Sequence, residues 1–246
     1  MILGVIPARY GSSRFPGKAL ASLEGKPLVQ WVWEKAKRSR RLDALVVATD
    51  DERIARAVDA FGGKAVMTSS QCASGTDRAW EAAKRTRAQI IVNIQGDEPL
   101  IQPSMIDRLV KGLLESEAQM ATLRFPMKNS AGFDDPNVVK VVTDSEGLAL
   151  YFSRSPLPAR KGKDTAPPVW YKHIGLYAYR RRLLEQFVRW SPSPLERTEG
   201  LEQLRALEHG VKIKVLDSPQ ESVGVDTPQD LKRVAKLLQE GTALHA

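Results

Sequence analysis

Apolar runs of strand length alternate with helical patterns over residues 2–117, and this alternation limits the fold more than any other feature of the chain. Strands separated by helices favour a mostly parallel sheet with helices on both faces. The sequence therefore predicts an α/β protein with a Rossmann-like architecture. The strand-like runs are residues 2–8, 44–51, 64–69 and 90–99, and the helical patterns are residues 28–41, 52–63, 77–85 and 103–117.

The pattern changes beyond residue 120. Strand-like runs over residues 121–127, 137–156 and 169–180 are joined by turns, which predicts a smaller antiparallel insertion over roughly residues 120–180. We then expect a helix over residues 194–210, strands over 211–217 and 222–226, and a final helix with Thr227 as its N-cap and Pro228 in its first turn. The 246 residues, 42% of them hydrophobic, suffice for one domain over residues 1–246.

Composition narrows the class of partner. The formal net charge of +8 is compatible with nucleic acid, an anionic membrane surface or a phosphorylated small molecule. The basic run KAKRSRR has no interleaved aromatic residues, so we expect no nucleic-acid binding. No apolar stretch approaches the roughly 20 residues that cross a bilayer, and no secretory signal is recognisable. A single cysteine, Cys72, excludes an internal disulfide and is expected only to pack, so a cytoplasmic protein is predicted.

The loop ARYGSSRFPGK directly follows the first predicted strand. It supplies Arg9, Ser13 and Lys18, and its glycines permit close approach of the backbone to a ligand. Cationic side chains and backbone N–H groups in this position would neutralise a triphosphate. The sequence matches neither the Walker A motif nor GxGxxG, so a solvated basic turn stays an equal alternative.

Two aspartates far apart in the sequence each follow an apolar run. Asp97 ends the run that leads into QGDEP, and Asp226 ends GVD. Carboxyl ends of parallel strands share one edge of a sheet, so the two carboxylates are expected to meet there. Mg²⁺ binds one or two carboxylates and completes its shell with phosphate oxygens and water. The alternative for Asp226 is that it caps the following helix.

Other polar segments suit a nucleoside and a sugar. SGTDR stands at a strand-to-helix junction, where capping is expected whether or not the loop also contacts a base. Cations and polar groups in FSRSP, KHIGLY and the helix over residues 194–210 would suit an acidic sugar, although that helix also reads as an ordinary solvated face. The residues concerned are Arg154, Lys172, His173, Tyr177, Glu196, Arg197, Glu199, Glu202 and Gln203.

Taken in order, these motifs resemble a known family over nearly the whole chain. RYGSSRFPGK, SGTDR, NIQGDEP, YFSRSP, KHIGLYAY, SPLERTEGLEQLR and GVDTPQDL are similar to segments of the 3-deoxy-manno-octulosonate (KDO) cytidylyltransferases, also called CMP-KDO synthetases. The resemblance implies a nucleotidyltransferase fold and a cytoplasmic homodimer whose interface the antiparallel insertion helps to form. It also implies the reaction of CTP with KDO to give CMP-KDO and diphosphate, for lipopolysaccharide biosynthesis.

The resemblance also implies roles for individual residues. Asp97 and Asp226 would hold Mg²⁺, and with Lys18 they would be the catalytic residues. CTP would contact Ala8, Arg9, Ser13, Lys18, Ser74, Gly75 and Arg78, and KDO would contact Gln95, Arg154, His173, Tyr177, Glu202 and Gln203. Which glutamate near residue 200 touches the sugar stays open.

Two alternatives to this function are retained. The chain could be a cytidylyltransferase for another acidic sugar, such as sialate or 8-amino-KDO. It could also be a non-catalytic nucleotide-binding regulator, although such a protein has no need of the pair Asp97 and Asp226 together with Lys18.

Overall fold

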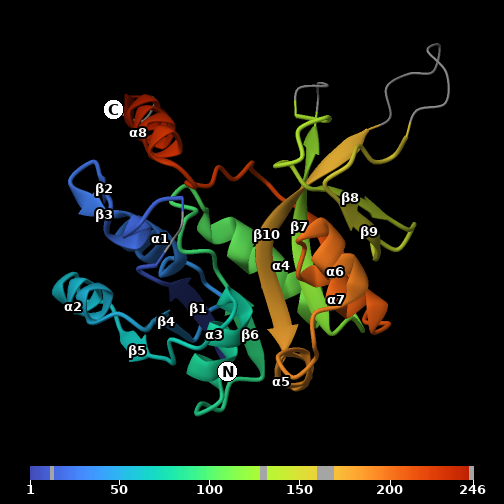
Figure 1. The fold of residues 1–246 in the computed structure, drawn as a ribbon, viewed down its shortest axis with the longest axis horizontal. Coiled ribbons are helices and arrows are strands. Elements are labelled where there is room, and N and C mark those ends of the chain that lie inside the picture. The colour runs from blue at the N-terminus through green and yellow to red at the C-terminus, as the bar shows by residue number, and fades with distance from the viewer. Residues whose placement is uncertain (12–13, 128–131, 160–168, 244–246) are drawn as a thin grey trace. The chain divides into compact units, whose positions relative to one another are not determined.

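A computed structural model describes residues 1–11, 14–127, 132–159 and 169–243 (Figure 1). It divides into two compact units, which are treated separately below. The N-terminal unit comprises Met1–Asp107 and Ser222–Ala246, and the central unit comprises Arg108–Glu221. The single domain expected over residues 1–246 stays a prediction.

The N-terminal unit is built on a parallel sheet with strand order β6-β1-β4-β5. These strands are β1 (Ile2–Ala8), β4 (Ala44–Thr49), β5 (Ala65–Met67) and β6 (Ile90–Asn93). Their apolar runs are long because parallel strands are covered on both faces: Val5, Val47 and Ile91 are fully buried. The predicted parallel α/β architecture is confirmed.

Helices connect these strands and cover the sheet. They are α1 (Leu28–Ala36), α2 (Glu52–Ala60) and α3 (Gly75–Ala83), while α8 (Pro228–Ala243) follows at the C-terminal end. Right-handed crossovers put α1 and α2 on one face and α3, whose chain returns to β6, on the other. A 3-10 turn, η1 (Lys18–Leu20), and a short hairpin of β2 (Ser22–Leu23) and β3 (Lys26–Pro27) precede α1 and were not expected from the sequence.

The central unit contains the predicted antiparallel strands. β7 (Met120–Met127) and β10 (Trp170–Arg180) pair antiparallel, and β8 (Lys140–Thr143) pairs antiparallel with β9 (Ala149–Ser153) and with β10. β11 (Ile213–Asp217) joins the other edge of β7 in parallel. The helix α4 (Pro103–Leu114) contains the boundary between the two units.

Several expected boundaries were wrong. The helix expected over residues 194–210 is two helices, α6 (Pro194–Glu199) and α7 (Gln203–Glu208), because Gly200 adopts a left-handed φ of 61° and ends α6. The helix from Leu28 ends at Ala36 rather than residue 41, and α5 (Arg181–Phe187) was not predicted.

Residues 222–226 do not form the expected strand. The N–H of Val225 donates instead to the carbonyl oxygen of Asp97 at 2.8 Å, so this segment is a loop held against another loop. Within the described ranges, no helix is long and apolar enough to traverse a lipid bilayer.

Candidate active site

A cavity of about 290 Å³ lies in the N-terminal unit, where β1 and β6 end. It gathers residues from the first loop, the SGTDR segment, QGDEP and the end of GVD, which are widely separated in the sequence. Most of the predicted nucleotide and metal residues line it: Ala8, Arg9, Lys18, Ser74, Gly75, Arg78, Asp97 and Asp226. Gln95, which was predicted to contact the sugar, lines it as well. Ser13 lies outside the described residues, so its predicted phosphate contact stays a prediction.

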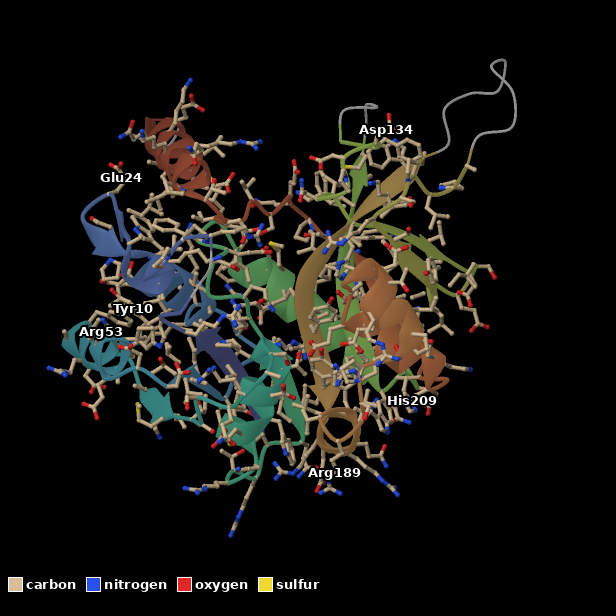
Figure 2. All side chains as sticks on the ribbon, viewed as in Figure 1. Tyr10, Glu24, Arg53, Asp134, Arg189 and His209 are labelled. Carbon is tan, nitrogen blue, oxygen red and sulfur yellow. The ribbon has the colours of Figure 1, made fainter. Side chains whose placement is uncertain are left out.

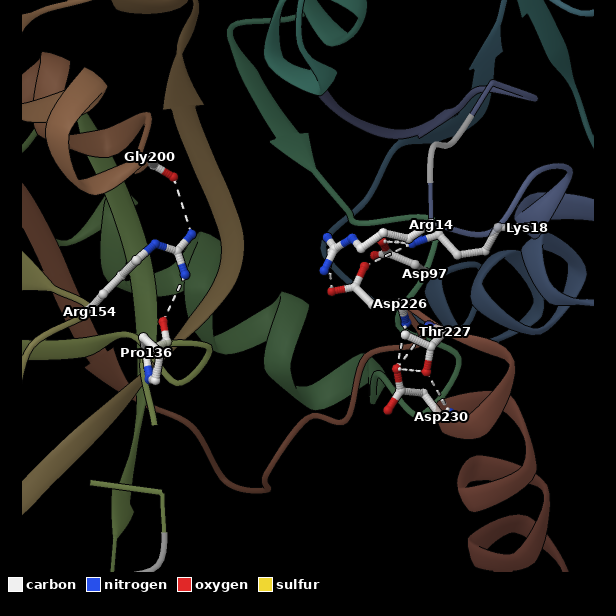
Figure 3. A network of polar contacts seen from close by, with 9 residues as sticks. All are labelled: Arg14, Lys18, Asp97, Pro136, Arg154, Gly200, Asp226, Thr227 and Asp230. Carbon is white, nitrogen blue, oxygen red and sulfur yellow. Dashed lines mark hydrogen bonds and ion pairs between the residues drawn. The ribbon is translucent and has the colours of Figure 1, made fainter. Parts of the chain in front are cut away.

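Lys18 stands between the two predicted metal ligands (Figure 3). Its Nζ lies 2.7 Å from Asp97 Oδ2 and 3.2 Å from Asp226 Oδ1. Arg14 Nη2 adds a second cation 3.4 Å from Asp226 Oδ2. The Lys18 side chain is only 15% exposed, so the pair with Asp97 is shielded from solvent and stronger than a surface ion pair.

One backbone and one side-chain hydrogen bond bring the loops of Asp97 and Asp226 together. The Val225 N–H donates to the Asp97 carbonyl at 2.8 Å, and the Ser222 hydroxyl donates to the carboxylate of Glu98. Val225 is itself fully buried, in a small core with Leu28. The loop that carries Asp226 is therefore fixed against the loop that carries Asp97.

The capping alternative for Asp226 is wrong. Thr227 caps α8 as predicted: its hydroxyl accepts from the Asp230 N–H at 3.2 Å, and the Asp230 carboxylate accepts from the Thr227 N–H at 2.9 Å (Figure 3). The carboxylate of Asp226 is directed to Lys18 and Arg14 instead.

The donor set around Lys18 fits a small, hard cation. One oxygen from each aspartate converges on a single positive centre, for which the ammonium is the present occupant. Mg²⁺ takes oxygen ligands, commonly one or two carboxylates with phosphate and water. No cluster of three or more His, Cys, Asp or Glu suited to a metal occurs in the described part of the chain, so a metal here would need ligand oxygens from outside the protein.

Hydrogen bonds of Ser74 and Arg78 order the wall of the cavity that α3 forms. Ser74 caps α3 in a capping box with Asp77, as expected for a helix start. Arg78 is 3% exposed and donates to Thr68 at 2.6 Å and to Asp50 at 2.9 Å. Arg78 therefore holds this wall in place and also lines the cavity.

The first loop is anchored through Tyr10. The Arg53 guanidinium stacks on the Tyr10 ring, 3.4 Å from its centre, and also donates to Asp51 (Figure 2). Gly17 has a φ of 71°, and a Cβ there would meet the Tyr10 ring at 3.2 Å. The glycine thus allows the loop to return closely beneath Tyr10, which brings Lys18 to the aspartates.

Cys72 also lines the cavity but has an unreactive thiol. Burial, together with a hydrogen bond from its Sγ to Glu81 at 3.1 Å, raises the pKa of Cys72 to about 11. The thiol is protonated at neutral pH, in keeping with the packing role expected for it.

Arg154, which was predicted to contact a sugar, lies in the central unit. Its guanidinium donates to three backbone carbonyls: Glu199 O at 2.6 Å, Pro136 O at 2.9 Å and Gly200 O at 3.4 Å (Figure 3). In the described part of the unit, no carboxylate forms an ion pair with it. Its positive charge is therefore held in place without being neutralised.

His173 is buried in β10 and stays neutral. Burial lowers the pKa of the His173 imidazole to about 3. Its Nε2 lies 3.0 Å from Thr122 Oγ1, whose single hydroxyl hydrogen has backbone carbonyls of Ile174 and Leu176 as acceptors. We therefore assign the ring proton to Nε2, which leaves Nδ1 as an acceptor. Tyr177 lies beside it, with ring centres 5.5 Å apart.

The glutamates near Gly200 have different partners. Glu196 is paired with Arg205 at 2.5 Å, and Glu199 accepts from Ser153 and from the Arg154 backbone N–H. Glu202 immediately precedes α7, and the neighbouring Gln203 is 4% exposed. Gln203 Nε2 is buried with no partner in the described chain, and a buried donor in that state is suited to a ligand.

Sequence reasoning missed Lys140. It is fully buried in β8, and its Nζ donates to Asp135 O and Arg154 O, both at 2.8 Å. The available signal was a lysine flanked by paired valines in NVVKVV, at an inward position of a strand.

The chain is similar over most of its length to known proteins. A family model described as "Cytidylyltransferase" matches residues 3–213. The chain is 52% identical to the 3-deoxy-manno-octulosonate cytidylyltransferase of Geobacter sulfurreducens, over 97% of this chain and 99% of that one. It is 54% identical to that of Geotalea uraniireducens, with coverage of 97% and 99%.

Solved structures give the same result. A CMP:2-keto-3-deoxy-manno-octonic acid synthetase complexed with CTP aligns with a TM-score of 0.92 and 42% identity, covering 98% of this chain and 99% of that one. A nucleotidyl transferase from Methanothermobacter thermautotroptrophicus, at 14% identity and a TM-score of 0.64 over 98% and 99% of the two chains, shares the fold.

Proposed function

Because this chain belongs to the 3-deoxy-manno-octulosonate cytidylyltransferases, we propose that it converts CTP and KDO into CMP-KDO and diphosphate. The anomeric 2-hydroxyl oxygen of KDO forms a bond to the α-phosphorus of CTP, the bond from that phosphorus to the β-phosphate oxygen breaks, and diphosphate leaves. The observation that carries the proposal is the convergence of Asp97 and Asp226 on one cationic centre in the cavity.

In the proposed reaction the N-terminal unit binds CTP. Arg9, Ser13 and Lys18 contact its phosphates, and the backbone at Ala8 with Ser74, Gly75 and Arg78 surrounds the cytidine. Since both substrates are anions, the main task of these cations is to offset repulsion while the hydroxyl is aligned.

Asp97 and Asp226 hold Mg²⁺ in this proposal. When bound there, the metal supplies charge neutralisation at the α-phosphate and lowers the pKa of the attacking hydroxyl. Lys18 then exchanges its two carboxylate partners for phosphate oxygens. No side chain is required as a dedicated general base.

In the proposed reaction, residues of the central unit bind the acidic sugar, and a contact between Gln95 and the sugar stays a prediction. Arg154 pairs with the sugar carboxylate, because its guanidinium is held in place and has no carboxylate partner in the described structure. His173, Tyr177, Glu202 and Gln203 contact hydroxyl groups; the neutral His173 offers an acceptor and Gln203 a buried donor. We further propose a cytoplasmic homodimer that serves lipopolysaccharide biosynthesis.

A substrate panel tests this function. Pyrophosphate release is measured with CTP, Mg²⁺ and each of KDO, 8-amino-KDO and sialate. We expect KDO to give the highest kcat/KM; a preference for either other sugar would replace it as substrate. CTP binding without pyrophosphate release for any of the three sugars would instead support a nucleotide-binding regulator.

The metal pair is tested by Asp97→Asn. We expect turnover to fall by about 10²-fold or more, because one charged metal ligand is lost, and the free energy of unfolding to be affected far less than turnover. Asp59→Asn, an exposed position on α2, is the matched control. Near-normal CMP-KDO synthesis by Asp97→Asn would show that the metal assignment is wrong.

A further inference from the structure

Three carbonyl oxygens contact the guanidinium of Arg154 and leave two of its N–H donors for a ligand. A guanidinium has five N–H donors. Within the described central unit, three of them are used, by Nε to Glu199 O, by Nη1 to Pro136 O and by Nη2 to Gly200 O. One N–H on each terminal nitrogen is left, and two such donors match the two oxygens of a carboxylate.

Glu199 contacts Arg154, but its carboxylate is bound by groups other than the guanidinium. Its Oε1 accepts from the Ser153 hydroxyl at 2.7 Å, and its Oε2 accepts from the Arg154 backbone N–H at 2.9 Å. Only its backbone carbonyl meets the guanidinium, at 2.6 Å from Nε. The carboxylate is thus fixed on neutral donors and kept from forming an ion pair with the guanidinium.

The carbonyls of Glu199, Pro136 and Gly200 form a carbonyl frame around the guanidinium of Arg154. Lys140 holds the backbone next to this frame. Its ammonium donates to the carbonyl of Arg154 itself and to the carbonyl of Asp135, which precedes the Pro136 carbonyl that Arg154 Nη1 contacts. Burial lowers the pKa of Lys140, while the negative charges of Asp135 and Asp134 oppose that shift. A fully buried lysine is costly, so its place here is explained by what it holds together.

We infer that Lys140 and Glu199 are positioning residues, which hold Arg154 oriented and un-neutralised so that its two remaining N–H donors bind the carboxylate of the acidic sugar. The inference rests on the proposed function. Neither residue is required to touch the substrate.

Steady-state kinetics with Lys140→Met test the inference. Methionine keeps the unbranched buried stem but removes the ammonium. We expect KM for KDO to rise about tenfold, because a small misplacement of a binding group is costly, with KM for CTP within twofold of the unaltered enzyme. Lys214→Met is the matched control, since the Lys214 ammonium also donates to a backbone carbonyl in this unit, that of Glu146, which is not among the carbonyls that Arg154 or Lys140 contacts.

A double variant separates positioning from general damage. If Lys140 acts through Arg154, adding Lys140→Met to Arg154→Ala should raise KM for KDO no further. Equal increases in both KM values, or an added effect in the Arg154→Ala background, would overturn the inference. Should Lys140→Met fail to fold, Glu199→Gln is expected to give the same selective rise in KM for KDO, and its absence would count equally against the inference.

A measurement that needs no turnover completes the test. The ¹⁵N-bound Nε–H signal of Arg154 should be protected from solvent exchange in the unaltered protein and lose that protection in Lys140→Met. An unchanged signal would overturn the positioning role. Absence of pyrophosphate release from the unaltered protein would contradict the proposed function, whereas the NMR comparison separately decides how Arg154 is held.

Discussion

Lys18 contacts two carboxylates at once, and its ammonium occupies the centre on which they converge. An adjacent positive charge weakens cation binding, so Lys18→Gln is expected to raise the affinity for Mn²⁺ about tenfold when no nucleotide is present. A tenfold change in affinity corresponds to about 1.4 kcal/mol. We expect no larger effect, because the Asp226 side chain is 52% exposed and solvent screens its charge. Titration followed by the EPR signal of free Mn²⁺ measures it.

Lys26→Gln is the control, because Lys26 pairs with Glu34, elsewhere in the same unit. The same Lys18→Gln variant should bind CTP more weakly, since it lacks a phosphate contact. Unchanged or weaker binding of Mn²⁺ without nucleotide would show that the ammonium does not compete with the metal.

His173 has a consequence for acid stability. Its pKa is about 3 in the folded protein and near the ordinary 6.5 in the unfolded chain. The unfolded state therefore takes up a proton first, and stability falls as pH drops from about 6.5 toward 3, by up to about 1.4 kcal/mol per pH unit. Urea unfolding at pH 7 and pH 5.5 should show a loss of roughly 1 kcal/mol that is absent in His173→Gln. An imidazole signal of His173 that titrates near pH 6.5 would contradict this.

At the scale of single elements, the loop after β6 depends on Gly96. A Cβ at this position would lie 2.7 Å from the carbonyl oxygen of Pro7, which is backbone at the end of β1 and has little room to move. We expect Gly96→Ala to lower the free energy of unfolding by about 1–3 kcal/mol and to displace Asp97, so that turnover falls as well. Chemical unfolding and pyrophosphate release measure the two effects.

Gly224→Ala is the matched control for Gly96. It lies in the loop that carries Asp226, where a Cβ would meet its nearest neighbour at an ordinary 3.9 Å. We expect it to change stability little. Comparable losses in both variants would show that the close approach at Gly96 is not the cause.

Elements with local signals were predictable, and elements decided by distant contacts were not. The alternation of apolar runs and helical patterns identified the parallel strands, and Thr227 with Pro228 identified the start of α8. The approach of Asp226 to Asp97 was expected, but through a strand that does not exist, since a backbone hydrogen bond from Val225 brings the loops together. The end of α6 at Gly200 was missed because one glycine inside a helical pattern costs only about 1 kcal/mol relative to alanine and does not by itself predict that a helix ends.

The role of individual side chains was less accessible from the sequence. The carbonyl frame around Arg154 joins residues 136, 199 and 200, and no local pattern reports such a contact. Lys140 was hidden for the same reason, because burial of a lysine is decided by its distant partners. Its position between two pairs of valines in NVVKVV was the only local sequence signal of its burial.

At the scale of the whole molecule, the proposed homodimer predicts a mass. Sedimentation velocity should give a species of twice the 27.3 kDa chain. Leu150 and Val169, in and beside the antiparallel strands that the resemblance places at the interface, are 61% and 65% exposed and so are positions at which the dimer can be tested. Leu150→Glu is expected to shift the equilibrium toward monomer, whereas Leu237→Glu on α8 is not. A monomer at all concentrations of the unaltered protein would refute the dimer.

The N-terminal unit is assembled from both ends of the chain, and this sets an order in time. Lys18 and Asp226 are 208 positions apart, with the whole central unit synthesised between Asp97 and Asp226. A chain still growing on the ribosome therefore presents Lys18 and Asp97 long before their third partner emerges. The charge pattern of the completed cavity exists only once Asp226 has been synthesised, so a chain interrupted before that residue carries a half-built site that lacks one of its two carboxylates.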